Sequence, residues 1–166
     1  MFSQKDFTAK AFEDYASYQE KSLNTRRFKH ADIQPLIEGL KKEPGFSIKK
    51  LGNSIEGRSI SMISLGTGKT TVLLWSQMHG DEPTATMAIF DLLNYFKSNK
   101  TLLDKINLHF IPMLNPDGAE QFNRRNAIGI DINRDAVRLQ SPESRILKAV
   151  RDSLKADFGF NLHDQS

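Results

Sequence analysis

The chain has 166 residues, of which 39% are hydrophobic and 26% are charged, and its formal net charge is +3. These values are typical of one globular domain with a real core, and the scattered basic pairs do not form the stripe that a nucleic-acid-binding face requires. The absence of cysteine excludes disulfides and thiolate ligands, so any metal must be held by His, Asp or Glu.

Hydrophobic periodicity predicts the elements. In chain order they are a peripheral helix or arm over about the first 30 residues, a helix over 31–42, strands over 46–48 and 58–65, a buried strand over 71–76, a helix over 83–97, a strand over 106–113, a helix over 142–155 and a strand over 157–162. The inner stripe of the helix over 83–97 is predicted to be Ile89, Leu92, Leu93 and Phe96. This order indicates an α/β fold with a mixed, twisted sheet flanked by helices.

The N-terminal residues contain no apolar stretch of the kind that a signal peptide needs, and no run approaches the roughly 20 apolar residues of a membrane span. We therefore expect a soluble chain, whose compartment the sequence leaves open. Residues 66–70 resemble the end of a phosphate-binding loop, but Ile63 stands where that motif requires glycine, and a strand follows where a helix should begin. We interpret residues 66–70 as a hairpin turn.

Three potential metal ligands follow two of the predicted strands. His79 and Glu82 come after the strand over 71–76, and His163 comes after the strand over 157–162. Two imidazoles and one carboxylate, with a fourth position open, are the ligands of a catalytic zinc, and the carboxyl ends of strands are where α/β sheets bind ligands. The sequence therefore predicts a zinc site, whereas His30 and His109 are interpreted as polar surface.

The segment over 115–135 is rich in arginine, asparagine and glycine. Arginine offers a planar, always-charged fork that suits a carboxylate, and beside zinc it also stabilises an oxyanion. The segment is therefore predicted to bind substrate. Within it, residues 115–118 are interpreted as a simple turn.

These motifs resemble the zinc carboxypeptidase family, the metallocarboxypeptidases of the digestive and regulatory kind and their bacterial relatives. The resemblance rests on residues 79–82, 115–118, 124–134 and 161–163, and it covers about residue 47 to the end of the chain. It implies two parts, a helical extension over 1–45 and the amino-terminal part of a catalytic domain over 46–166.

The resemblance also implies roles for individual residues. His79, Glu82 and His163 would bind zinc, and Arg124 would polarise the scissile carbonyl and steady the oxyanion. Asn133 and Arg134 would hold the terminal carboxylate of the substrate. The substrate would be a peptide, or an acylated amino acid, with a free carboxylate. Asp81 stands where some family members carry a substrate-contacting arginine, which is a departure from the family pattern.

The family's glutamate general base would lie beyond Ser166, so the resemblance implies a chain that binds zinc but is inactive by itself. Uncovered sheet edge and apolar surface would then favour self-association. Two alternatives remain open. One is a zinc amidohydrolase of the aspartoacylase or succinylglutamate desuccinylase type, and the other is a non-catalytic module that binds carboxylates.

Overall fold

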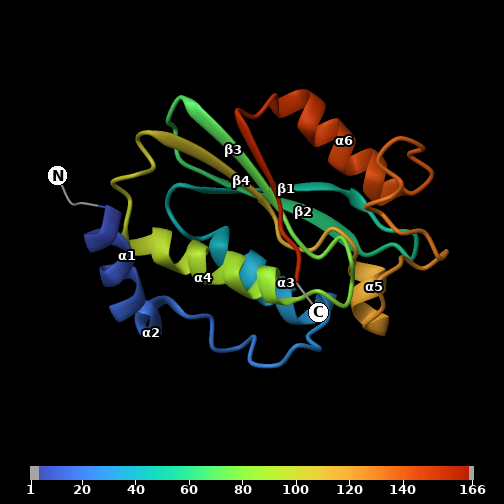
Figure 1. Ribbon diagram of the computed structural model, residues 1–166, viewed down its shortest axis with the longest axis horizontal. Coiled ribbons are helices and arrows are strands. Elements are labelled where there is room, and N and C mark those ends of the chain that lie inside the picture. The colour runs from blue at the N-terminus through green and yellow to red at the C-terminus, as the bar shows by residue number, and fades with distance from the viewer. Residues whose placement is uncertain (1–3, 165–166) are drawn as a thin grey trace.

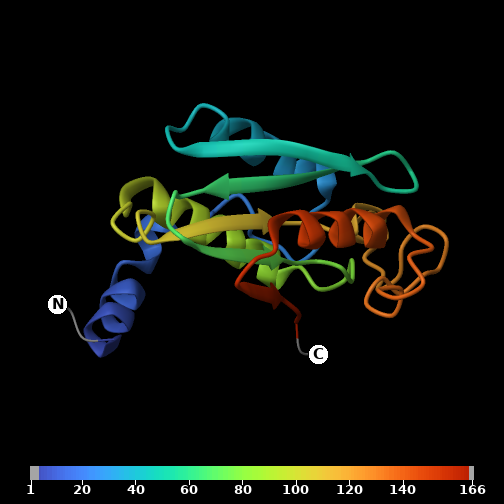
Figure 2. The ribbon, with the colours of Figure 1, turned by 90° about the horizontal axis from the view of Figure 1, so that it is seen from above.

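The computed structural model describes residues 4–164, with side chains from Thr8 onward. Its centre is a five-stranded sheet in the order β1-β2-β4-β3-β5 (Figures 1 and 2). The strands are β1 (Phe46–Asn53), β2 (Ser59–Leu65), β3 (Thr70–Trp75), β4 (Ile106–Ile111) and β5 (Phe158–Asn161). The β1·β2 and β2·β4 pairs are antiparallel, whereas β3 is parallel to both β4 and β5. The predicted mixed sheet is therefore confirmed.

Helices cover both faces of this sheet. They are α1 (Gln4–Glu13), α2 (Tyr15–Tyr18), α3 (His30–Leu40), α4 (Thr84–Ser98), α5 (Pro116–Gln121) and α6 (Pro142–Leu154). Apolar residues of α3 and α4 share one core cluster with the sheet, and those of α6 share a second, so the helices lie on opposite faces (Figure 1). Among the described residues, no helix combines the length and the apolar character needed to cross a membrane.

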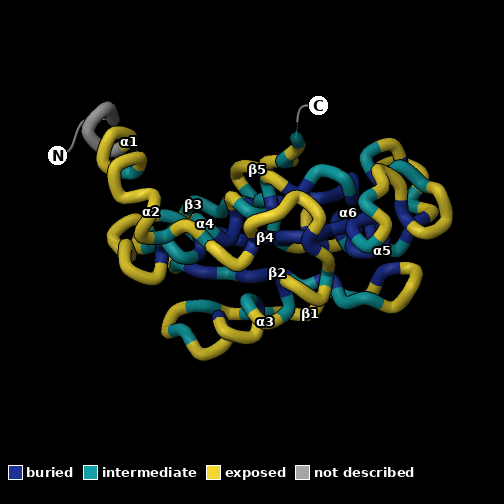
Figure 3. Tube along the Cα trace, turned by 90° about the horizontal axis from the view of Figure 1, so that it is seen from below, coloured by how far each residue is buried: buried dark blue, intermediate teal, exposed yellow. Residues whose placement is uncertain are grey.

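The middle of the sheet is apolar on both faces because helices cover both of them. In β2, Ile63 belongs to the cluster of α3 and α4, and Ile60 belongs to the cluster of α6; both are 0% exposed. Burial of each such side chain stabilises the fold by roughly 1.5–3 kcal/mol. Figure 3 shows β2 and β4 as mostly buried, which makes them a rigid platform for the loops at their ends.

Residues before β1 also reach the core. Leu23 and Phe28 are buried in the same cluster as Ile33 and Ile37 of α3. Ile33 and Ile37 belong to the helical pattern over 31–42, so this pattern marks the face of α3 that packs on the sheet. The division of the chain at residue 46 stays a prediction.

The connection between β2 and β3 is not a hairpin turn, and that interpretation was wrong. β4 lies between the two strands, so residues 66–69 cross over the start of β4. A Cβ on Gly68 would lie 1.8 Å from the carbonyl carbon of Lys105, and one on Gly66 would lie 2.2 Å from the carbonyl oxygen of Ile106. Glycine is required at residues 66 and 68 because the backbone of this connection lies directly against the backbone at the start of β4.

Two side chains lie differently from their predicted positions. His109 is 7% exposed rather than on the surface, because β4 has neighbours on both edges; its Nδ1 lies 2.8 Å from Oγ of Ser64. Leu92 is 39% exposed, so the inner stripe of α4 is narrower than predicted. His30 is half-buried, with Nε2 2.9 Å from the carbonyl oxygen of Ser59.

Candidate metal centre

The loop after β3 fixes His79 by its backbone and by buried polar contacts. Gln77 has a φ of 48°, which is uncommon for a residue other than glycine. Its amide nitrogen donates to the carbonyl oxygen of Gly80 at 3.0 Å, and its amide oxygen accepts from Oγ1 of Thr86 at 2.9 Å. His79 is only 2% exposed. An unusual backbone conformation held in this way is typical of a functional site.

This loop packs directly on α5. A Cβ added to Gly80 would lie 2.0 Å from the carbonyl carbon of Gly118, so only glycine allows the two backbones to approach. Asn115, which is fully buried, donates to the carbonyl oxygens of Met78 at 3.2 Å and Arg124 at 3.4 Å. The segments of His79 and Arg124 are therefore joined through one side chain.

Residues 115–118 begin a short helix, α5, and the interpretation as a simple turn was wrong. Oδ1 of Asn115 accepts from the backbone N–H of Gly118 at 2.9 Å, and Pro116 takes the first helical position, where its missing N–H is harmless. Asp117 is buried and accepts from Oγ of Ser54 at 2.7 Å and from a guanidinium nitrogen of Arg58 at 2.7 Å. The helix is thereby fastened to the turn between β1 and β2.

The three predicted ligands meet in space. Ligand atoms of His79, Glu82 and His163 all lie within 4.8 Å of one another. Nδ1 of His79 lies 2.8 Å from one carboxylate oxygen of Glu82, and Nδ1 of His163 lies 2.6 Å from the other. His163 arrives at the end of β5, the neighbour of β3. Sheet pairing brings the two distant motifs together.

The chemistry of the donor set fits a cation. Both ring nitrogens of His79 face carboxylate oxygens, because Nδ1 lies 2.8 Å from Glu82 and Nε2 lies 3.2 Å from Oδ1 of Asp131. A neutral imidazole has one N–H, so it donates to one of these oxygens and turns a lone pair toward the other. Two imidazoles and one carboxylate are ligands that zinc takes.

Both carboxylates of the centre are held in the charged form. Partial burial by itself raises the pKa of Glu82, but hydrogen bonds with His163 and His79 outweigh it and hold that pKa below its ordinary value. Burial likewise raises the pKa of Asp131, and hydrogen bonds from His79 and Arg124 bring it below its ordinary value. Metal ligands and their supporting carboxylates need this ionised state.

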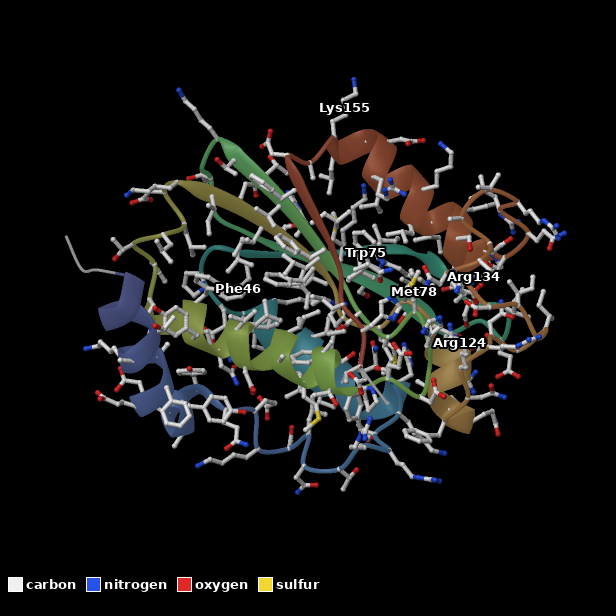
Figure 4. All side chains as sticks on the ribbon, viewed as in Figure 1. Phe46, Trp75, Met78, Arg124, Arg134 and Lys155 are labelled. Atoms are coloured by element: carbon white, nitrogen blue, oxygen red, sulfur yellow. The ribbon has the colours of Figure 1, made fainter. Side chains whose placement is uncertain are left out.

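Of the residues predicted to act on the substrate, Arg124 contacts the trio. Nε of Arg124 donates to Oδ2 of Asp131 at 3.0 Å, and a second nitrogen lies 3.5 Å from Glu82. Asn133 lines a cavity of about 330 Å³ with Trp75 and other residues, whereas Arg134 lines a different cavity. Figure 4 shows Arg124 and Arg134 at the same end of the molecule.

Two acidic residues beside the ligands have other surroundings. Asp164 follows His163, yet its carboxylate accepts from Oγ1 of Thr84 at 2.9 Å and pairs with Arg26 at 3.0 Å, so it anchors the start of α4. Oδ1 of Asp81 is buried and has no hydrogen-bond partner among the described residues.

Sequence reasoning missed Asp131 and Asn115 as parts of the centre. Asp131 lies within the motif over 124–134, but nothing in its spacing says that it contacts His79. Asn115 carried a better signal, because an asparagine directly before proline is a common start of a helix.

Comparison with known proteins decides the family. The family model described as "Zinc carboxypeptidase" matches residues 33–151, more than half of the chain. The chain belongs to the zinc carboxypeptidase family. Carboxypeptidase 2 of Trichophyton tonsurans is 27% identical over 125 residues, which cover 67% of the chain and 23% of that relative. An uncharacterized protein of Zymomonas mobilis is 26% identical over 137 residues, and the chain spans 36% of its length.

Solved structures share the fold. A metallo-carboxypeptidase from Burkholderia cenocepacia superposes with a TM-score of 0.75 at 24% identity, over 83% of this chain and 41% of that one. Carboxypeptidase A from Helicoverpa armigera superposes with a TM-score of 0.73 at 20% identity, over 98% of this chain and 53% of that one. The five-stranded sheet therefore corresponds to part of the carboxypeptidase fold.

Proposed function

We propose that this chain carries the metal-binding part of a zinc-dependent carboxypeptidase, which hydrolyses the peptide bond before a free terminal carboxylate. The observation that supports the proposal is the convergence of His79, Glu82 and His163 in a chain of this family. These three residues would hold the zinc, which would supply a Lewis acid and lower the pKa of a bound water.

The protein's own residues would position the substrate. We assign Arg124 to the developing oxyanion, because its side chain is 43% exposed and only part of its guanidinium is used by Asp131. Arg134 would bind the terminal carboxylate, since this exposed residue has no side-chain hydrogen bond or ion pair among the described residues. Asn133 would assist from the same turn. Asp131 orients His79 and Arg124 at once.

We further propose that residues 1–166 alone bind zinc with little or no peptidase activity. A general base typically contributes about 10²- to 10⁴-fold, and it must be free to accept the proton of water. Asp131 is hydrogen-bonded to His79 and Arg124, and Asp164 is hydrogen-bonded to Thr84, so neither carboxylate is free for this task.

Metal analysis tests the proposal. The wild type should bind one zinc per chain, His79→Ala and His163→Ala should bind none, and His30→Ala, a half-buried histidine outside the trio, should bind as the wild type does. Equal zinc content in all four proteins would refute the metal site. Activity of residues 1–166 on blocked dipeptides should be negligible; turnover comparable with that of a full carboxypeptidase would show that these residues supply a general base of their own.

The same assays separate the alternative functions. Hydrolysis of acylated amino acids rather than peptides would indicate an amidohydrolase of the aspartoacylase or succinylglutamate desuccinylase type. Carboxylate binding without zinc would indicate a binding module. The family match and the residues of its motifs favour the peptidase.

A further inference from the structure

A second arginine lies beside the proposed carboxylate-binding residue. Arg134 and Arg138 line one cavity of about 380 Å³, whose other walls are Ile130, Asp131, Asp135 and Gln140. This volume is in the range of sites for small ligands. Asp131 also contacts His79 and Arg124, so the cavity shares a wall with the candidate metal centre.

The acidic residues of this cavity do not neutralise the arginines. Oδ1 of Asp135 accepts from the backbone N–H of Gln140 at 3.0 Å, and Oδ2 accepts from that of Ser141 at 2.8 Å. Asp131 is bound to His79 and Arg124. Among residues 8–164, the side chains of Arg134 and Arg138 have no hydrogen bond or ion pair, so two of the residues that line the cavity carry positive charges that no carboxylate neutralises.

The turn that carries Arg138 is ordered. The backbone N–H of Leu139 donates to the carbonyl oxygen of Asp135 at 2.8 Å, and Leu139 has a φ of 53°. The guanidinium of Arg145 donates to the carbonyl oxygens of Leu139 and Gln140, both at 2.9 Å, and joins the turn to α6. Arg138 is therefore presented from a fixed backbone, which reduces the entropy lost on binding.

We propose that Arg138 determines specificity by binding a second carboxylate, so that the preferred substrates are peptides ending in aspartate or glutamate. Arg134 would hold the terminal carboxylate and Arg138 the carboxylate of the last side chain. Two planar, always-charged forks in one cavity match a dianion, whereas a terminal lysine or arginine would be repelled. This inference rests on the proposed function, because it uses Arg134 for the terminal carboxylate.

Calorimetric titration of the zinc-loaded chain with N-acetyl-Ala-Glu and N-acetyl-Ala-Gln tests the inference, because the two peptides have nearly the same size and differ by one charge. The wild type should bind the glutamate peptide about tenfold more tightly. Arg138→Gln should abolish that preference and leave the affinity for the glutamine peptide unchanged. Arg125→Gln is the matched control, because Arg125 donates to the carbonyl oxygen of Gly129 and does not line the cavity.

The outcomes separate this inference from the proposed function. If the chain binds zinc but binds both peptides with equal affinity, or binds neither, the role of Arg138 is refuted and the metal centre is not affected. A preference that depends on Arg138 in a chain that takes up no zinc would support the acidic subsite and refute the metal proposal.

Discussion

Asn115 joins three segments of the metal centre, and the effect of its removal can be worked out from its contacts. Its side chain is 0% exposed, caps α5 through Gly118 at 2.9 Å, and donates to the carbonyl oxygens of Met78 at 3.2 Å and Arg124 at 3.4 Å. Loss of a helix cap costs about 1 kcal/mol. Each of the other two bonds contributes about 0.5–1.5 kcal/mol, and unsatisfied buried carbonyls add to the loss.

Asn115→Ala should therefore lower the free energy of unfolding by about 2–4 kcal/mol, a large part of the ~5–15 kcal/mol of a typical domain. Urea unfolding can be followed by the fluorescence of Trp75, the single tryptophan, which is 9% exposed. Asn123→Ala is the control in the same segment, since Asn123 is exposed and accepts one hydrogen bond, from the backbone of Arg125. A loss below about 1 kcal/mol for Asn115→Ala, or equal losses for both variants, would refute this account of the centre.

Three further changes have defined outcomes. Gly80→Ala should reduce both the zinc content and the melting temperature, because the added Cβ would meet the backbone of Gly118. Gly39→Ala is the control, since a Cβ at residue 39 has no atom within 4 Å. Equal melting temperatures for the two variants would contradict the close approach of the backbones at Gly80. Burial lowers the pKa of His109 below its ordinary 6.5, so the unfolded chain takes up a proton at a higher pH than the folded chain does. The contribution of neutral His109 to the free energy of unfolding is therefore complete above that pH, and it falls by up to about 1.4 kcal/mol for each pH unit below it. His109→Leu should therefore flatten the dependence of unfolding free energy on pH between 7.5 and 5, and an unchanged slope would argue against it. In an active form of the protein, Arg124→Ala should lower kcat about 100-fold with KM nearly unchanged, because the contact strengthens only in the transition state; an effect on KM alone would reassign the residue.

The sequence predicts the elements well where burial is local and periodic. The continuous apolar run of β3 and the helical spacing of α4 each report a face that neighbours cover. The order of the strands was less accessible. β4 enters between β2 and β3 through long-range pairing, and Gly66 and Gly68 report a crossing of two backbones only when the sheet is known. His109 was misjudged because one polar residue in a strand says nothing about which strands lie beside it.

The ligand trio could be predicted from the sequence because zinc takes few residue types as ligands, and because the pairing of β3 with β5 brings the ends of these strands together. The supporting residues were less visible. Asp131 contacts His79 across a large sequence separation, and an acidic residue within an irregular polar segment has no periodicity to mark it. Which side chains are paired, and which arginines stay unpaired, follows only from the folded geometry.

The third ligand, His163, directly follows the least buried strand, β5. All four residues of β5 are exposed (Figure 3), and β5 lies at the edge of the sheet that residues 4–164 form. His79, by contrast, is 2% exposed. A bound ion would join this strand to the buried loop after β3, so the free energy of local opening at residues 158–163 becomes part of the affinity for the ion. Dissociation would then begin with fraying of β5 rather than with unfolding of the core. Removal of the metal would expose this strand to hydrogen exchange and to proteases while β4 stays protected.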